Sequence, residues 1–243
     1  METGAFGLIS ALVIDGKHTL HIMDPQARRI DHIGSVQMPS LPPRAYGSMI
    51  ARGDGTYLLG EHMVGQIPGF EGAGRVYQAD ANGTIIREWD TQTNRGMGGF
   101  LGVTHMALSP DGDTLYHVSE TGPHIYAHDL KADKRLGIIY ERRDPPPMVF
   151  GLACLEDGDL IVATGSGARR LDAQGVVKRD YMLPAGRGWS VIVLRAGGDS
   201  FWALDFFGGT VALVDVDSGD VRMTRDLGLP KALAGIAEMP SAT

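Results

Sequence analysis

A repeated hairpin unit is the sequence feature that most constrains the fold. Each copy is an apolar strand, a tight turn ending in glycine, and a second apolar strand. Four copies occur, over residues 49–62, 106–120, 152–165 and 191–205. Glycine supplies the positive φ that such turns require, and aspartate tolerates it. The repeat therefore predicts regularly spaced antiparallel hairpins and little helix.

A second unit recurs five times. It is a short strand ending in aspartate, followed by a turn and a more polar strand. The Asp-ending strands of the five copies lie at residues 19–24, 75–80, 125–129, 169–172 and 211–215. The mismatch between four copies and five is informative. An N-terminal strand (6–13) leads directly into the first Asp-ending strand, and the tail (234–240) has the pattern of a first strand that lacks its partner.

We therefore expect an all-β, five-bladed β-propeller with four antiparallel strands per blade. The C-terminal strand is expected to join the three N-terminal strands and close the ring, which satisfies edges that would otherwise stay open. Residues 1–243 are expected to form a single domain. Two long loops, 63–74 and 91–102, are the main insertions.

Composition limits the partners. The 243 residues carry 22 basic and 29 acidic side chains, a net charge of -7. A chain this acidic has no general attraction to nucleic acid or to anionic membranes, so we expect neither as a partner. No secretory signal is evident and a disulfide cannot form from the single Cys154, so we expect a cytoplasmic protein and a buried, inert thiol. Short, charged edge strands favour a monomer or a weak dimer.

The run Leu108-Ser109-Pro110-Asp111-Gly112-Asp113-Thr114-Leu115-Tyr116, followed by Ile125-Tyr126-Ala127-His128-Asp129, resembles the blade motif of the gluconolactonase-like propellers. It is also similar to YVTN and NHL repeats. The resemblance implies a propeller with a site at the mouth of its central channel. The gluconolactonase-like enzymes are metal-dependent lactone hydrolases, so lactone or ester hydrolysis is the first activity that the resemblance implies.

The metal ligands of those enzymes are not matched. Thr104 stands where the family has an asparagine, Phe150 stands where it has an aspartate, and no Gly-Glu-Gly-Pro run occurs. The family's metal site is therefore not carried over. A different divalent-metal site is an open alternative, built from imidazole and carboxylate groups of two neighbouring blades: Glu61, His62, His105, His117 and Glu120. Adjacent residues such as Glu61 and His62 face opposite ways on a strand, which counts against a complete set.

The repeat alignment indicates which residues share one end of the blades. Polar residues close the second strands at His62, Ser119, Thr164 and Asp205. Aromatic and polar residues open the first strands at Tyr46, Thr104, His105, Phe150 and Trp189, and Arg187 lies beside Trp189. We predict His62, His105 and Asp205 as catalytic groups. We predict the substrate-binding residues to be Tyr46, Thr104, Ser119, Phe150, Thr164, Arg187 and Trp189.

Two functions stay open at this point. The first is an enzyme acting on a small organic molecule, either a lactone or ester hydrolase or an acid–base lyase or isomerase. The second is a non-catalytic propeller that binds a protein, peptide or sugar on its top face, because the fold does not dictate function. Convergent histidines and carboxylates would favour the enzyme, and a broad apolar rim would favour the binding module.

Overall fold

The protein is all β. The computed structural model describes residues 7–12, 17–23, 29–37, 40–41, 44–64, 73–93, 100–186 and 188–238, with side chains for 48–61, 74–93, 102–186 and 188–236. Its contacts group into two compact units. Unit 1 comprises residues 1–38, 163–168 and 180–243, and unit 2 comprises residues 39–162 and 169–179. The expectation of a single domain stays a prediction.

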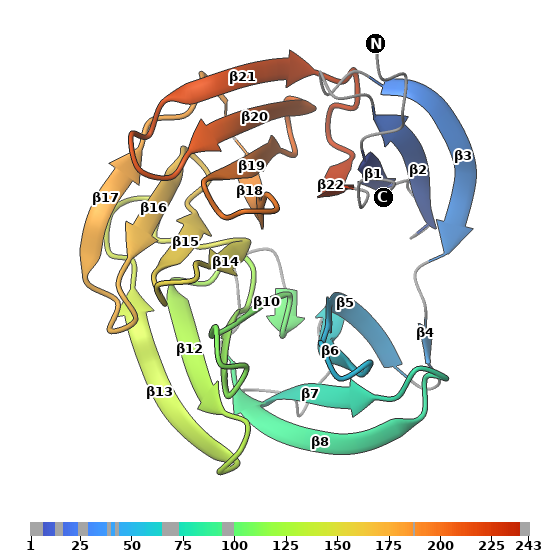
Figure 1. Cartoon of the computed structure of the whole chain (residues 1–243), viewed down its shortest axis with the longest axis vertical. Helices are drawn as coiled ribbons and strands as arrows, with labels where there is room; N and C mark the ends of the chain where they lie inside the picture. Colours follow the sequence, from blue (N-terminus) through green and yellow to red (C-terminus); the bar gives the residue numbers. More distant parts are fainter. Residues whose placement is uncertain are drawn as a thin grey trace. The chain divides into compact units, whose positions relative to one another are not determined.

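Unit 1 contains two four-stranded antiparallel sheets (Figure 1). One has the order β22-β1-β2-β3, from β1 (Gly7–Leu12), β2 (Lys17–Met23), β3 (Arg29–Gln37) and β22 (Leu233–Glu238). The other is β18 (Trp189–Leu194), β19 (Ser200–Asp205), β20 (Thr210–Asp215) and β21 (Val221–Asp226). The C-terminal strand therefore pairs with the first N-terminal strand, as the sequence predicts. A core that includes Trp202, Leu213 and Ile236 joins the two sheets.

Unit 2 contains a regular blade, most of a second blade and one larger sheet. The regular blade is β10 (His105–Leu108), β11 (Thr114–Val118), β12 (His124–Asp129) and β13 (Lys134–Glu141). The second blade is β14 (Leu152–Cys154), β15 (Leu160–Ala163), β16 (Ala168–Leu171) and β17 (Val177–Tyr181). The larger sheet is β4 (Ser40–Leu41), β5 (Arg44–Ala51), β6 (Tyr57–Val64), β7 (Ala73–Ala79), β8 (Ile85–Gln92) and β9 (Phe100–Gly102).

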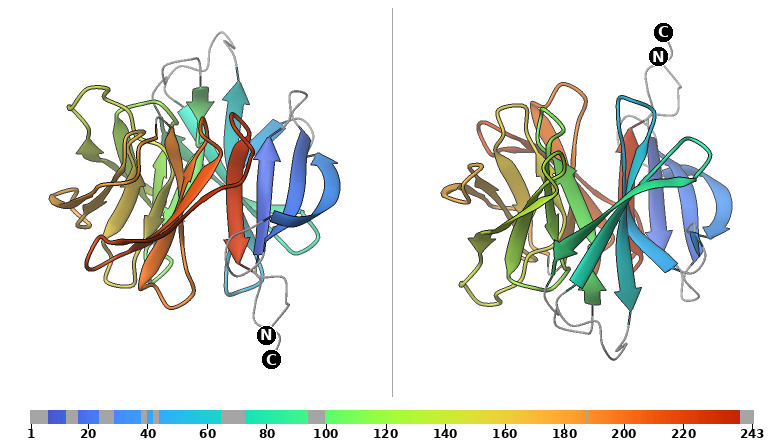
Figure 2. Two further views of the ribbon diagram at one scale, coloured as in Figure 1. Left: turned by 90° about the horizontal axis from the view of Figure 1, so that it is seen from above. Right: turned by 90° about the horizontal axis from the view of Figure 1, so that it is seen from below.

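The prediction of five four-stranded blades is wrong. The structure has four blades of four strands, and the remaining strands form a six-stranded sheet. The reason lies in β6, which pairs with β7 over Tyr57–Gly60 and then with β9 over His62–Val64. Residues in the two predicted insertions thus extend the sheet. Figure 2 shows the twist within the four-stranded blades, which is typical of propeller sheets.

The three inner strands of blade β10–β13 are buried on both faces because their alternate residues enter different cores. Tyr116, Val118 and Ile125 pack with Leu160 and Val162 of the next blade. Met106 and Leu115 pack with Leu58, Val76 and Trp89 of the six-stranded sheet. The indole Nε1 of Trp89 donates a hydrogen bond of 3.1 Å to the carbonyl of Leu130.

We expect Gly175→Ala to destabilise the protein more than Gly158→Ala. Both glycines have positive φ, of 82° and 88°. A Cβ at Gly175 would overlap the carbonyl oxygen of Ile139, whereas a Cβ at Gly158 meets nothing within 4 Å. Both variants therefore share the conformational cost, and the clash adds about 1–3 kcal/mol in Gly175→Ala alone. Urea unfolding measures the difference, and equal midpoints would contradict the packing described here.

Candidate functional site

The predicted site residues fall into two groups, one in each unit. Unit 2 holds Thr104, His105, Ser119 and Phe150, and unit 1 holds Thr164, Trp189 and Asp205. His62 and Tyr46 lie on β6 and β5 of unit 2, but their side chains are outside the described residues, as is the whole of Arg187. The predicted catalytic residues His105 and Asp205 therefore belong to different units.

The unit 2 group is assembled around the short strand β9. Gly102 of β9 pairs with His62 of β6, so the end of β6 lies beside the start of blade β10–β13. The hydroxyl of Ser119 donates a hydrogen bond of 2.7 Å to the carbonyl of Gly102. Ser119 is fully buried, so this hydroxyl fastens the end of β11 to β9.

Thr104 fixes the backbone of Glu120, the residue that follows Ser119. Its backbone N–H and its hydroxyl both donate to the carbonyl of Val118, at 3.0 and 3.1 Å. The same hydroxyl accepts a hydrogen bond of 2.7 Å from the backbone N–H of Glu120. Thr104 thus positions the backbone of Glu120, and a role of Thr104 or Ser119 in binding substrate stays a prediction.

His105 and Glu120 form an imidazole–carboxylate pair at this end of the blade. Nε2 of His105 lies 3.9 Å from Oε2 of Glu120, and the two side chains are 24% and 26% exposed. Burial lowers the pKa of His105 to about 4. The imidazole is therefore neutral at pH 7, where one ring nitrogen can accept a proton. Among the described side chains, His105 is the only predicted catalytic residue with an acidic side chain within 4 Å.

Phe150 follows a residue, Val149, that is hydrogen-bonded to the turn after Glu120. The turn after Glu120 is tied to the segment before β14, since Thr121 N–H donates to the Val149 carbonyl and Val149 N–H donates to the Gly122 carbonyl. Phe150 follows Val149 and is half-buried. The strands β10 and β14 are neighbours, and Phe150 lies two residues before β14.

Asp205 is a turn-capping residue in unit 1. It is 3% exposed, and its Oδ1 accepts hydrogen bonds from the backbone N–H groups of Phe207 (3.0 Å) and Gly208 (3.1 Å). A Cβ at Gly186 or Gly208 would come within 2.7 and 2.5 Å of its Oδ2. The carboxylate is therefore enclosed by backbone, which supports a structural role. Its prediction as a catalytic group gains no support from this geometry.

Trp189 and Thr164 belong to the same part of unit 1. Trp189 pairs with Asp205 between β18 and β19, and forms an isolated bridge with Gly165. Its ring is 1% exposed, and Nε1 donates a hydrogen bond of 3.2 Å to the Pro184 carbonyl. The ring of Trp189 thus contributes to packing. Thr164 donates its backbone N–H to the carbonyl of Gly167.

The five-residue metal hypothesis is not supported. Among the described residues, no group of three or more His, Cys, Asp or Glu side chains is placed to hold a metal ion. Glu61 accepts a hydrogen bond of 3.0 Å from the Tyr77 hydroxyl. His117 is fully buried within blade packing. Glu61, His105, His117 and Glu120 therefore do not form one site.

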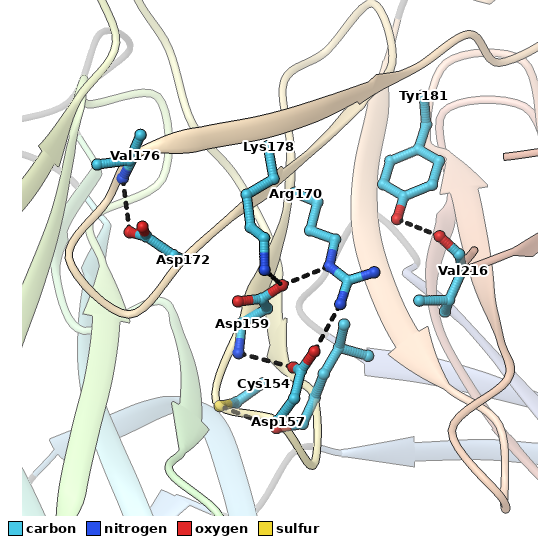
Figure 3. A network of polar contacts seen from close by, with 10 residues as sticks. Cys154, Asp157, Asp159, Arg170, Asp172, Val176, Lys178, Tyr181 and Val216 are labelled. Carbon is cyan, nitrogen blue, oxygen red and sulfur yellow. Dashed lines mark hydrogen bonds and ion pairs between the residues drawn. The ribbon is translucent and has the colours of Figure 1, made fainter. Parts of the chain in front are cut away.

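A charged network in blade β14–β17 is also structural (Figure 3). The buried carboxylate of Asp159 accepts hydrogen bonds from Arg170 (2.6 Å) and Lys178 (2.7 Å), and Arg170 also bonds Asp157. Burial acts to raise the pKa of Asp159, but these hydrogen bonds outweigh it and the pKa is lowered. Nearby, burial raises the pKa of Cys154 to about 12, which leaves the thiol protonated.

We expect Asp205→Ala to lower the free energy of unfolding by about 1–3 kcal/mol, because the N–H groups of Phe207 and Gly208 lose their buried carboxylate acceptor. Asp226→Ala is the matched control: its carboxylate accepts one hydrogen bond from the Gly228 N–H, but it is exposed to water. The control should lose less than about 1 kcal/mol. Urea unfolding measures both variants. Equal losses would show that burial of the cap has no effect on stability.

Comparison with known proteins gives a fold but no family. No protein-family description matches the chain, and no curated protein matches it. A luciferin-regenerating enzyme matches with a TM-score of 0.54 and 13% identity, over 82% of this chain and 69% of that chain. A protein from Lactobacillus plantarum matches with a TM-score of 0.55 and 14% identity, over 93% of this chain and 69% of that one.

The β-propeller domain of Swd1 from Myceliophteria thermophila also matches, with a TM-score of 0.53 and 16% identity, over 79% of this chain. The chain spans 58% of that structure's length. Within the part of the chain that the structure describes, no helix is long and apolar enough to cross a membrane. The solved structures that it resembles are β-propeller proteins, and the chain is likewise an all-β propeller protein.

Proposed function

We propose that the chain is an enzyme that acts on a small organic molecule by acid–base chemistry at His105 and Glu120. The observation that carries this proposal is the pair itself: a partly exposed, neutral imidazole 3.9 Å from a partly exposed carboxylate. General acid–base groups are often more distant from one another before substrate binds. The position of the pair, at the start of a first strand and the end of a second strand, is where propellers commonly hold ligands.

The chemistry follows from the protonation states. Neutral His105 takes a proton from water or from a carbon next to a carbonyl group. The carboxylate of Glu120 then stabilises the imidazolium that forms. With water as the proton donor, the reaction is hydrolysis of a lactone or ester. With a carbon acid as the donor, it is an elimination or isomerisation. Phe150, which lies just before the adjacent strand β14, would contact the apolar part of the substrate.

The rigidity of the site supports the same proposal. Three hydrogen bonds through Thr104 fix the backbone on both sides of the pair, at Val118 and at Glu120. Catalytic groups need such support because small displacements reduce the rate. Thr104 is therefore a positioning residue for Glu120. The expected small-molecule ligand, cytoplasmic location and lack of nucleic-acid or membrane partners accompany this proposal as predictions.

The test is a panel of lactones and aryl esters, together with a deuterium-exchange assay for carbon acids next to carbonyl groups. We expect one class to turn over, and His105→Gln to reduce the rate by about 10²-fold or more. Glu120→Gln should reduce it less. The rate should rise with pH around 4 and level off above it, because the base form of His105 predominates there.

A matched control lies on the same blade. His124 and Glu141 also form an imidazole–carboxylate pair with 3.9 Å between Nε2 and Oε1. They lie on β12 and β13, away from the first strand. His124→Gln should leave the rate unchanged. Full activity in His105→Gln would refute the assignment, even if the protein proves to be an enzyme.

A second candidate, the non-catalytic binding module, has one observation in its favour. Two contacting loops of unit 1 expose Met182 (84%) and Phe207 (54%). A Cβ at Gly188 would touch the ring of Phe207, which shows that the loop after Met182 packs against it. If no compound in the panel reacts, these two residues become the first to replace in binding assays with peptides and sugars.

A further inference from the structure

In the described part of the chain, the layer between the six-stranded sheet and blade β10–β13 contains buried polar atoms that make no hydrogen bond. Both sheets belong to unit 2, and Leu58, Val76 and Trp89 line one side of the layer while Met106 and Leu115 line the other. Among the described residues, Thr91, Thr93, His117 and His128 have buried side-chain atoms there or at its end without hydrogen bonds. Unpaired polar groups in an apolar layer are costly, at about 1–3 kcal/mol each.

His117 lies in this layer. It is two residues beyond Leu115 on the same face of β11, and it pairs across the sheet with Met106 and Tyr126. It is fully buried, and neither ring nitrogen has a hydrogen-bond partner. Its ring stacks on Tyr126 with centroids 5.4 Å apart and planes 21° apart. The side chain is thus held by packing alone.

His128 is the diagonal neighbour of His117. It lies opposite Leu115 on β12, two residues from Tyr126, so both imidazoles face the same layer. It is 1% exposed, its Nε2 lies 3.2 Å from Oδ1 of Asp133, and its Nδ1 has no partner. Three of the four ring nitrogens in the two histidines are therefore without a hydrogen bond.

The other charged and titratable groups around the layer do not compensate for a charge on His117. Asp133 contacts His128, and Arg135, opposite His128 on β13, adds a positive charge and donates to the Asp90 carbonyl of β8. Arg87 of β8 lies over Trp89. Tyr126 stacks on His117, and burial raises the pKa of its hydroxyl to about 12, so it carries no charge. His124 and Glu141 lie at the other end of β12 and β13.

We infer that His117, with His128 at the diagonal position, forms an acid-sensitive latch, which holds blade β10–β13 against the six-stranded sheet while the His117 imidazole is neutral and releases it when that imidazole takes up a proton. Protonation of His117 places a positive charge, with two N–H donors and no acceptor, among apolar side chains. A second charge on His128 repels it at the diagonal position. The layer relieves both costs by opening to water.

The direction of the pH effect follows from linkage. Burial, with a further contribution from the charge on His128, lowers the pKa of His117 from 6.5 to about 3. Between these values the opened or unfolded chain binds more protons than the closed chain. The closed state is therefore most stable above pH 6.5 and loses stability as the pH falls towards 3. Each unit of pKa difference corresponds to about a tenfold change in the opening equilibrium.

The test is amide hydrogen exchange of peptides from residues 105–129 at pH 7.5 and pH 4.5, corrected for the intrinsic effect of pH. All proteins carry His105→Gln, which removes the other histidine of this blade with a pKa near 4. In that background we expect opening to increase at least about tenfold at pH 4.5. Adding His117→Phe, which keeps the ring against Tyr126, and His128→Gln should abolish most of the increase. His124→Gln, at the rim, should keep it.

Two outcomes would overturn the latch: no increase in opening at pH 4.5, or the same increase in the protein that lacks both histidines. If that protein fails to fold, the titration of His117 by NMR in the His105→Gln protein decides. A His117 imidazole that titrates near pH 6.5 while the blade amides stay protected rules the latch out. Protonation that occurs only together with loss of amide protection supports it.

Discussion

Burial of the strands on both faces is the constraint on which unit 2 depends. In blade β10–β13, odd and even residues enter two different apolar cores, so no strand position in the middle of the blade is free for a solvated side chain. Polar groups must then lie at the strand ends, as Thr104 and Ser119 do, or be buried at a cost. The candidate catalytic pair, His105 and Glu120, lies at the strand ends, whereas His117 and His128 are buried.

The fold was largely predictable because turns and apolar alternation are local signals. The turns ending at Gly112 and Gly158 were recognised, and so was the pairing of the tail with the N-terminal strands. The six-stranded sheet was not predictable, because the change of partner along β6 at His62 depends on where β9 lies in space. No spacing in the sequence records that change.

The candidate site was only partly predictable. The repeat alignment placed His105 at the start of a first strand. Glu120 was a candidate metal ligand but not a predicted catalytic residue, because it lies one residue beyond the aligned position of Ser119. The same alignment placed Ser119 and Asp205 at equivalent positions, each at the end of a second strand. The two side chains make different hydrogen bonds. Ser119 donates to Gly102 of the neighbouring strand β9, whereas Asp205 accepts from the backbone of its own turn. His128 gave no signal because a histidine in an apolar strand resembles any other half-buried position.

The sheet made by β22 and β1–β3 has a consequence for how the chain is made. The edge strand β22 is synthesised after the other three strands of this sheet, more than two hundred residues after its neighbour β1. Until then β1 presents an unpaired edge, while the blades between can already fold on local contacts. During synthesis, this edge of β1 therefore stays unpaired until β22 has been made. In that interval a chaperone or another nascent chain can compete with β22 for the same hydrogen bonds.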